Sequence, residues 1–451
     1  MSPRPRFCDG IARRSFLQVG AVGAFGFGLN LPTLLAQQAR AAETGGGGKD
    51  DVSVIYVFLK GGLSTIDTFD MKPDAPVDIR GDFKPAKTNV PGVQICELLP
   101  RVAQQMDKIS LVRSFGHKNS SHGPADHYML TGYHPTAGFN PGLKPNNQRP
   151  SLGSIVARKL GPRGSVPAYV CLPNLHPSAG AAYLGAAAAP FVIDADPSAV
   201  GFAVPDLAPP LVLDASRLQR RRRLLARVDR FQRAVETEAN IVEANSNART
   251  VNVFRQKAFE LATSPRAKKA FDIHAESDKL RDQYGRHTLG QSCLMARRLV
   301  EAGVRCVTVN HSNWDTHDNN FVVLKKELLP MFDSGISTLF RDLHERGMLK
   351  TTLVVITGEF GRTPRINNRA GRDHWGPGFT VILGGGGLAG GCVVGSSDKW
   401  AEKPADNPYG PEDLAATVFH QLGINPKLVF HTPEGRPVPA VNDGRVIRGL
   451  M

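Results

Sequence analysis

The stretch that decides the fold is Val52-Ser-Val-Ile-Tyr-Val-Phe-Leu59. It is short, rich in β-branched residues and almost continuously apolar, which is typical of a strand covered on both faces in a parallel sheet. Lys60-Gly61-Gly62 follows it directly. Because open α/β sheets bind ligands beyond the carboxyl ends of their strands, we expect this loop to border a site.

Apolar segments of the same kind recur along the chain and alternate with helical patterns. Strands are predicted at 109–114, 166–172, 304–310, 352–357 and 379–383. Helices are predicted at 98–106, 289–302 and 328–346, and a Pro/Gly/Asn-rich loop at 133–151. This alternation predicts an α/β fold with a mostly parallel central sheet flanked by helices.

Residues 214–300 have a different character, and we interpret them as a helical insertion within a single domain that spans 51–451. The segment 214–238 is rich in Arg and Leu at helical spacing, and 265–282 continues the pattern after a capping serine at position 264. Helix 289–302 then ends at Gly303, and the strand pattern returns.

Polar side chains gather directly after three of the predicted strands. In chain order they include His122, Asp315, His317, Glu359, Arg362 and His374. A single Asp or His in a loop more often caps a turn or binds the backbone. Imidazoles and carboxylates are also the ligands that borderline divalent ions such as Zn²⁺ or Mn²⁺ select, and three such clusters behind strand ends favour one shared metal site.

Several of these motifs carry a resemblance to a known superfamily. Ser121-His122-Gly-Pro-Ala-Asp-His-Tyr-Met-Leu-Thr-Gly132 resembles the sulfatase signature, in which a nucleophilic cysteine precedes a proline and a closing Leu-Thr-Gly. Residues 351–361 are similar to that superfamily's strand ending in Asp-His-Gly. Trp314-Asp-Thr-His317 and Arg372-Asp-His374 resemble its metal-binding segments. From about 50 to 451, the chain resembles an exported sulfatase-like family of the alkaline-phosphatase-like superfamily.

The resemblance implies a divalent metal ion held by Asp315, His317 and His374, with Zn²⁺ or Mn²⁺ favoured over Ca²⁺ or Mg²⁺. It also implies the remains of a second metal site, with Glu359 as one ligand. The first acidic ligand of the superfamily is replaced by Lys60-Gly61-Gly62.

The other residues of that second site are Asp67, as a substitute for the missing acid, and His122. His122 occupies the nucleophile position, where a sulfatase has an oxidised cysteine. Strict sulfatase activity is therefore not expected.

Two functions remain open on these residues. In the first, the protein hydrolyses phosphate or sulfate esters, with His122 as nucleophile or general acid and with Arg362 and Lys60 binding the anion. Arg362 could instead form an ion pair with Glu359. In the second, the protein is a degenerate, non-catalytic binding protein for an anionic glycan or a surface partner.

The chain has 451 residues, with 55 Lys and Arg against 41 Asp and Glu, a formal net charge of +14. Spread over a chain of this length, that charge is a weak argument for nucleic acid, and we expect none as a partner. The densest basic run, 220–223, is interpreted as a solvated helix face. Nothing in the sequence indicates an oligomeric state.

The N-terminus carries the parts of an export signal. Arg13-Arg14-Ser-Phe-Leu17 precedes a glycine-interrupted apolar stretch, and Ala39-Arg-Ala-Ala42 is typical of a cleavage site. We predict a twin-arginine signal at 1–42, a flexible linker at 43–50, and a periplasmic or extracellular protein with no transmembrane helix once the signal is removed. An uncleaved signal that acts as an anchor remains an alternative.

Overall fold

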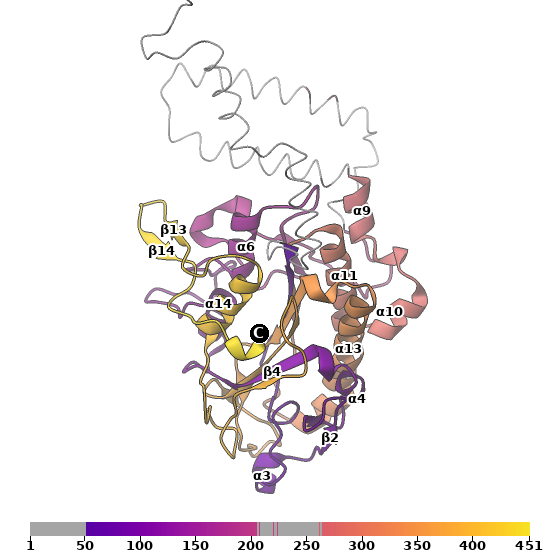
Figure 1. Ribbon diagram of the computed structural model, residues 1–451, viewed down its shortest axis with the longest axis vertical. Coiled ribbons are helices and arrows are strands. Elements are labelled where there is room, and N and C mark those ends of the chain that lie inside the picture. The colour runs from indigo at the N-terminus through magenta and orange to yellow at the C-terminus, as the bar shows by residue number, and fades with distance from the viewer. Residues whose placement is uncertain (1–50, 205–206, 208–219, 221–222, 224–260, 262–263) are drawn as a thin grey trace, which may run out of the picture. The chain divides into compact units, whose positions relative to one another are not determined.

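The computed structural model describes residues 51–204, 207, 220, 223, 261 and 264–451 (Figure 1). The chain divides into two units, 1–51 and 52–451, and the second contains the elements described below. The predicted export signal and linker lie outside the described residues. So does the predicted helix at 214–238, apart from Arg220 and Arg223.

The central sheet of the described chain has eight strands in the order β12-β4-β11-β8-β1-β7-β5-β6. Their bounds are β1 Ser53–Leu59, β4 Ile109–Phe115, β5 Tyr169–Leu172, β6 Phe191–Val192, β7 Cys306–His311, β8 Thr352–Thr357, β11 Phe379–Gly385 and β12 Val393–Val394. β1 lies between β7 and β8 and runs parallel to both, while β11 runs antiparallel to β4 and β8. The predicted α/β class with a mostly parallel sheet is confirmed.

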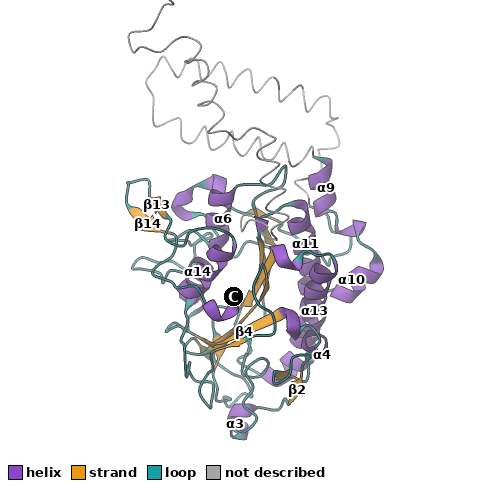
Figure 2. Ribbon diagram, in the orientation of Figure 1, coloured by secondary structure: helices purple, strands orange, loops and turns teal. Residues whose placement is uncertain are grey.

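Strand β1 is central because its side chains serve two cores. Ile55 and Val57 point into one hydrophobic cluster, and Tyr56 and Phe58 point into the other, as the two-residue period of a strand requires. Helices cover both faces (Figure 2). The first face is packed by α4 (Pro100–Ala103), α9 (Pro265–Phe271), α11 (Thr288–Ala302) and α13 (Leu329–Glu345), and the second by α5 (His122–Thr131), α6 (Leu152–Leu160) and α14 (Pro411–Gln421).

The segment predicted as one helix at 265–282 is divided in the structure. α9 ends at Phe271, a 3-10 turn covers Ile273–Ala275, and α10 spans Asp278–Tyr284. Two caps cause the division, because the side chain of Asp272 accepts from the His274 N–H and that of Ser277 from the Leu280 N–H. Shorter helices are α3 (Val77–Arg80) and α12 (Asn320–Val323).

The antiparallel direction of β11 decides which loops share an edge of the sheet. Between β8 and β11 the chain forms a small hairpin of β9 (Gly361–Arg362) and β10 (His374–Trp375). β11 begins at the edge where β8 ends, so the glycine run 384–387 lies at the opposite edge. The other hairpins are β2 (Pro85–Lys87) with β3 (Gln94–Cys96) and β13 (Val429–His431) with β14 (Pro437–Pro439).

Across the part of the chain that the structure describes, no helix has the length and apolarity needed to cross a bilayer.

Candidate metal centre

The candidate site lies where the loops after β1, β4, β7 and β8 meet at the carboxyl edge of the sheet. The loop after β4 leads to His122 at the start of α5, and the loop after β7 carries Asp315 and His317. The chain after β8 supplies Glu359 and, on β10, His374. Parallel strands place these loops side by side, as the sequence pattern predicted.

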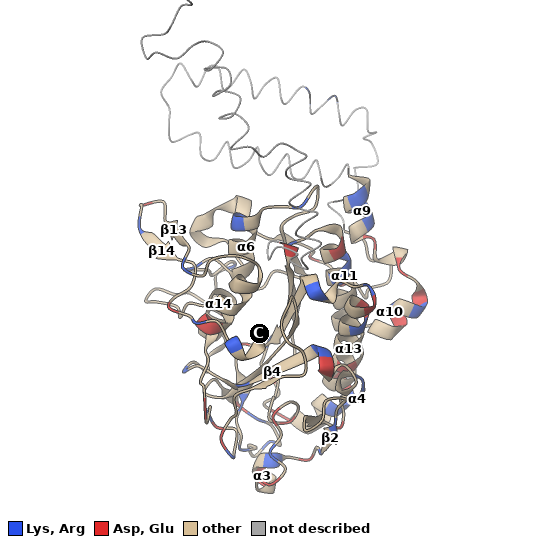
Figure 3. Ribbon diagram, viewed as in Figure 1, with Lys and Arg blue, Asp and Glu red and all other residues tan. Residues whose placement is uncertain are grey.

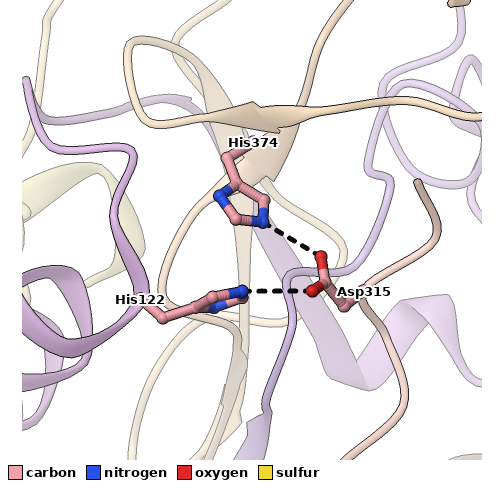
Figure 4. A group of neighbouring side chains, drawn as sticks. All are labelled: His122, Asp315 and His374. Atoms are coloured by element: carbon pink, nitrogen blue, oxygen red, sulfur yellow. Dashed lines mark hydrogen bonds and ion pairs between the residues drawn. The ribbon is translucent and has the colours of Figure 1, made fainter.

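Three of these side chains face a common point (Figure 4). One ligand atom from each of His122, Asp315 and His374 lies within 4.8 Å of the others. The two carboxylate oxygens of Asp315 are shared between the imidazoles, with Oδ2 at 3.1 Å from Nε2 of His122 and Oδ1 at 3.0 Å from Nε2 of His374. His122 and His374 are half-buried and Asp315 is exposed, so these three side chains can be reached from solvent.

His317 adds a third imidazole to this group. Its Nε2 lies 3.1 Å from Oδ1 of Asp315 and 2.9 Å from Nε2 of His374. Ligands at about 2.0–2.1 Å from a tetrahedral zinc ion are about 3.3 Å apart, so these separations need to open by only a few tenths of an ångström. The group formed by His122, Asp315, His317 and His374 is called the His/Asp cluster below.

The outer nitrogen of each imidazole is held by an oxygen atom. Nδ1 of His122 lies 2.6 Å from Oε1 of Glu359, and Nδ1 of His317 lies 2.6 Å from Oδ1 of Asp373. Nδ1 of His374 lies 3.0 Å from the Ser120 carbonyl oxygen, which can only accept a hydrogen bond. Without a metal, Nε2 of His122 and Nε2 of His374 also bond Asp315, whose carboxylate can only accept, so these nitrogens carry protons. With a metal bound, each ring would keep its proton on Nδ1 and turn the lone pair of Nε2 inward.

Nε2 lone pairs that face a carboxylate repel it, so this arrangement requires either protons on Nε2 or a cation between the groups. Metal-binding histidines have this same outer support, an oxygen atom on the ring nitrogen that does not bind the metal. Three imidazoles and one carboxylate suit Zn²⁺ or Mn²⁺ better than Ca²⁺ or Mg²⁺, which prefer oxygen ligands. The donor set of the His/Asp cluster therefore fits a borderline divalent ion.

The charges of the cluster also favour a cation. Hydrogen bonds with Asp315 and Glu359 raise the pKa of His122 to about 9. Burial acts to raise the pKa of Asp315, but hydrogen bonds from His122, His374 and Arg362 outweigh it and hold that pKa well below its usual range. Without a metal, a proton on His122 supplies the positive charge, and a metal would have to displace it.

Arg362 fixes the position of the Asp315 carboxylate from the buried side. Its guanidinium is 2 % exposed and donates to Asp315, to the Gly62 carbonyl at 3.1 Å and to the Trp314 carbonyl at 3.2 Å. It also donates to the carbonyl oxygens of Gly61 and Arg372. These bonds engage its donors with the protein, so the structure shows no free face on Arg362 for a substrate anion.

Gly61 allows the loops after β1 and β7 to touch. Its φ is +111°, and a Cβ atom there would lie 2.4 Å from the backbone nitrogen of Asp315. Its N–H donates to both carboxylate oxygens of Glu359, at 2.9 and 3.0 Å. Gly61 therefore links the residue that supports His122 to the loop that carries Asp315.

The remaining predicted residues have different surroundings. Glu359 has no exposed surface and contacts the cluster only through His122. Asp67 is also buried and forms a two-pronged ion pair with Arg372, at 2.7 and 2.8 Å, so it takes no part in the cluster. Lys60 is half-buried at the end of β1, and its ammonium forms no ion pair with any described residue.

The sequence grouped the metal ligands differently from the structure. It placed His122 with Glu359 and Asp67 in a second, eroded site, whereas the structure brings His122 together with Asp315 and His374. Two groups that hold the outer nitrogens of the cluster's histidines were not predicted in that role from the sequence. The Asp373 carboxylate could have been found from its position next to His374, but the Ser120 carbonyl gives no signal in a sequence.

An α/β protein with a histidine- and aspartate-lined centre at the carboxyl edge of its sheet is the class that this fold and site define. Residues 51–451 match the model of a family described as "Protein of unknown function (DUF1501)", and the chain belongs to that family. A search of curated proteins gave no match.

Solved structures of other proteins resemble the chain at low sequence identity. The lipoteichoic acid synthase LtaP from Listeria monocytogenes is 11% identical over 88% of this chain and 76% of its own, with a TM-score of 0.38. The PsFucS1 sulfatase from Pseudoalteromonas sp. is 11% identical over 87% and 70%, with a TM-score of 0.35. The phosphonate monoester hydrolase SpPMH from Silicibacter pomeroyi is 12% identical over 88% and 76%, with a TM-score of 0.32.

Proposed function

We propose that this protein is a metal-dependent hydrolase of phosphate or sulfate esters. The observation that carries the proposal is that the Nε2 atoms of three imidazoles, those of His122, His317 and His374, lie 3.0–3.1 Å from the Asp315 carboxylate. His122, Asp315, His317 and His374 would hold one divalent ion, Zn²⁺ or Mn²⁺ by the chemistry of the donor set. Such an ion polarises an ester oxygen and lowers the pKa of a bound water toward neutrality.

The chain's own residues would then orient the centre and receive the anion. Glu359 holds the ring of His122, and Asp373 holds that of His317. Arg362 keeps the Asp315 carboxylate in place. Lys60, which directly follows β1 at the same edge of the sheet, is the candidate for attracting an anionic ester as a point charge.

The role of His122 is the point at which geometry and sequence differ most. The sequence suggested a nucleophile or a general acid, but both ring nitrogens of His122 are engaged, one by Glu359 and one by Asp315. This favours His122 as a metal ligand. Since neither Cys nor Ser occupies that position, strict sulfatase activity remains outside the proposal.

The second candidate function is a binding protein that keeps a structural metal and has no turnover. It is favoured by the engagement of both ring nitrogens of His122 and by the burial of Arg362, which leave neither residue free for the role in hydrolysis that the sequence suggested. An anionic glycan or a surface partner would be its ligand. The two candidates differ in turnover and in how readily the metal leaves.

Metal analysis of the purified protein, followed by assays on a panel of aryl phosphates, phosphonates and sulfates, tests the proposal. We expect close to one equivalent of metal, loss of hydrolysis on chelation and recovery on adding Zn²⁺ or Mn²⁺. The variant His374→Ala should lose both metal and activity, whereas His431→Ala, at an exposed histidine on β13, should keep both. Tightly held metal with no turnover on any ester would favour the binding protein, and absence of metal uptake would contradict both.

We also propose that residues 1–42 direct export by the twin-arginine route, which delivers folded proteins to the periplasm or beyond. Fusion of this segment to a reporter that is active only outside the cytoplasm tests the proposal. Replacing Arg13 and Arg14 by lysine should abolish export, and an unaffected reporter would contradict it.

A further inference from the structure

A polar groove lies in the helical layer, away from the His/Asp cluster. It lies between α4, α10 and α13, and α13 packs against both of the other helices. Its volume is about 820 Å³, within the range of roughly 300–1,000 Å³ that is usual for small-molecule sites. α4 and α13 lead into the amino ends of β4 and β8, so the groove is not part of the carboxyl edge that holds the cluster.

The charge of the groove is positive. Arg101, Lys279 and Arg341 line it, one from each helix. Figure 3 shows both basic (blue) and acidic (red) positions on α10. Neither Arg101 nor Lys279 forms an ion pair within the described part of the chain. The acidic residue of the lining, Asp282, is already paired with Arg286 at 2.5 Å. Arg341 lies 4.0 Å from Glu345 and donates to Oε1 of Gln283 at 3.0 Å. The groove therefore offers two cations, Arg101 and Lys279, that have no ion-pair partner in the described chain.

The neutral part of the lining consists of the side-chain amides of Gln104, Gln105 and Gln283 and the hydroxyl groups of Ser337 and Thr338. Oε1 of Gln105 is buried and has no hydrogen-bond partner, which is costly for a polar atom. Ser337 and Thr338 are buried and donate their hydroxyl hydrogens to the carbonyl oxygens of Asp333 and Gln283, so neither hydroxyl has a hydrogen left to donate. A ligand that satisfies both Oε1 of Gln105 and the unpaired cations must bring a donor, such as a hydroxyl, together with its negative charge.

We propose that this groove binds an anionic saccharide. Its sulfate, phosphate or carboxylate groups pair with Arg101, Lys279 and Arg341, and one of its hydroxyls donates to Oε1 of Gln105. A simple polyanion satisfies the cations alone, and a neutral sugar satisfies the acceptor alone. The site does not depend on whether the His/Asp cluster hydrolyses esters.

Titration calorimetry on the full chain tests the proposal with three probes that differ in charge and in hydroxyl groups. These are a heparin-derived tetrasaccharide, the neutral maltotetraose, and tripolyphosphate, which is anionic but has no hydroxyls. We expect the sulfated tetrasaccharide to bind with a salt-dependent affinity and the other two to bind at least about tenfold more weakly. Equal binding of tripolyphosphate would show that the groove reads charge only and would overturn the saccharide assignment.

Single charge removals locate the site. Arg101→Gln, Lys279→Gln and Arg341→Gln should each weaken tetrasaccharide binding by about five- to tenfold. Arg436→Gln removes the same charge from an exposed residue beside β14 and should leave binding within about twofold. Equal losses in the control and the groove variants would contradict the proposal.

Two further variants separate this groove from the metal centre. Gln105→Leu removes the acceptor, so it should weaken the tetrasaccharide and leave tripolyphosphate unchanged. His374→Ala should leave tetrasaccharide binding in the groove unchanged, even if all ester hydrolysis is lost. If His374→Ala abolishes binding and the groove variants do not, the saccharide occupies the metal centre and the groove proposal is wrong.

Discussion

Nδ1 of His122 lies 2.6 Å from Oε1 of Glu359, a carboxylate with no exposed surface that also accepts the Gly61 N–H. The pair joins two segments 237 residues apart in the sequence. Because Glu359 holds the proton on Nδ1, it turns Nε2 of His122 toward Asp315. A buried acid that supports a histidine in this way orients a metal ligand without touching the metal.

Replacing this acid should weaken metal binding without removing a ligand. We expect Glu359→Gln to lower Zn²⁺ affinity by about 10- to 100-fold, because the amide can present its NH₂ group to His122 and no longer fixes the ring. Competition with a chromophoric chelator measures the affinity. Glu402→Gln, at an exposed acid on a neighbouring loop, is the control and should bind Zn²⁺ as the parent does. Unchanged affinity in Glu359→Gln would mean that His122 is not a ligand.

The ion pair beneath the cluster leads to a prediction about folding. Arg362→Gln leaves the Asp315 carboxylate and several buried carbonyls without their donor, so we expect a loss of about 3–5 kcal/mol in the free energy of unfolding. Urea denaturation of the metal-free protein measures it. Arg365, three residues on, is 74% exposed and paired with Asp78, so Arg365→Gln should cost no more than about 1 kcal/mol. Similar losses in both variants would show that burial of Arg362 adds nothing.

The α/β fold could be predicted from local sequence patterns, because these patterns form the expected strands in the structure. Each apolar run predicted as a strand forms one, because a buried strand needs little beyond its own β-branched, apolar residues. The antiparallel direction of β11 could not be predicted from the sequence, since an apolar run looks alike in parallel and antiparallel strands. The breaks after Phe271 and before Asp278 depend on single capping side chains, which a helical period does not reveal.

The candidate site was predictable in its residue types and only in part in its contacts. Asp315, His317 and His374 follow strands whose ends meet, and the structure brings them together. The sequence could not show that His122 would join them, because that depends on where α5 begins relative to β10. Nor could it show that Asp67 would be engaged by Arg372, since the two are 305 residues apart.

Gly61 should be intolerant of a side chain for two separate reasons. Its φ of +111° is unfavourable for other residues, and a methyl group would meet the backbone of Asp315. We expect Gly61→Ala to displace the Asp315 loop and to lower Zn²⁺ affinity at least about tenfold, as misplaced ligands do. Gly92→Ala is the matched control, since Gly92 has a φ of +81° but nothing within 4 Å of the added atom. If both variants keep the parent affinity, close approach at Gly61 is not needed for the cluster.

Buried histidines outside the cluster should make the protein sensitive to acid. His127 has no exposed surface, its Nδ1 lies 3.0 Å from the Tyr133 carbonyl, and its Nε2 accepts the N–H groups of Gln148 and Arg149. A second proton on the ring would sit on Nε2 and would point its N–H at the N–H groups of Gln148 and Arg149. Burial accordingly lowers the pKa of His127 from 6.5 to about 4.

Because the pKa of His127 is lower in the folded protein than in the unfolded chain, acid should lower the free energy of unfolding. Below pH 6.5 the unfolded chain takes up a proton that the folded chain refuses until about pH 4, so stability is complete above this window and falls with the pH across it. Each such histidine contributes a slope of at most about 1.4 kcal/mol per pH unit. Urea denaturation of the chelated protein at several pH values measures the slope. His127→Gln should lower the slope of unfolding free energy against pH by up to the contribution of one proton. His431→Gln, at an exposed residue of β13, should leave the slope unchanged. An unchanged slope in His127→Gln would show that His127 is already protonated in the folded protein.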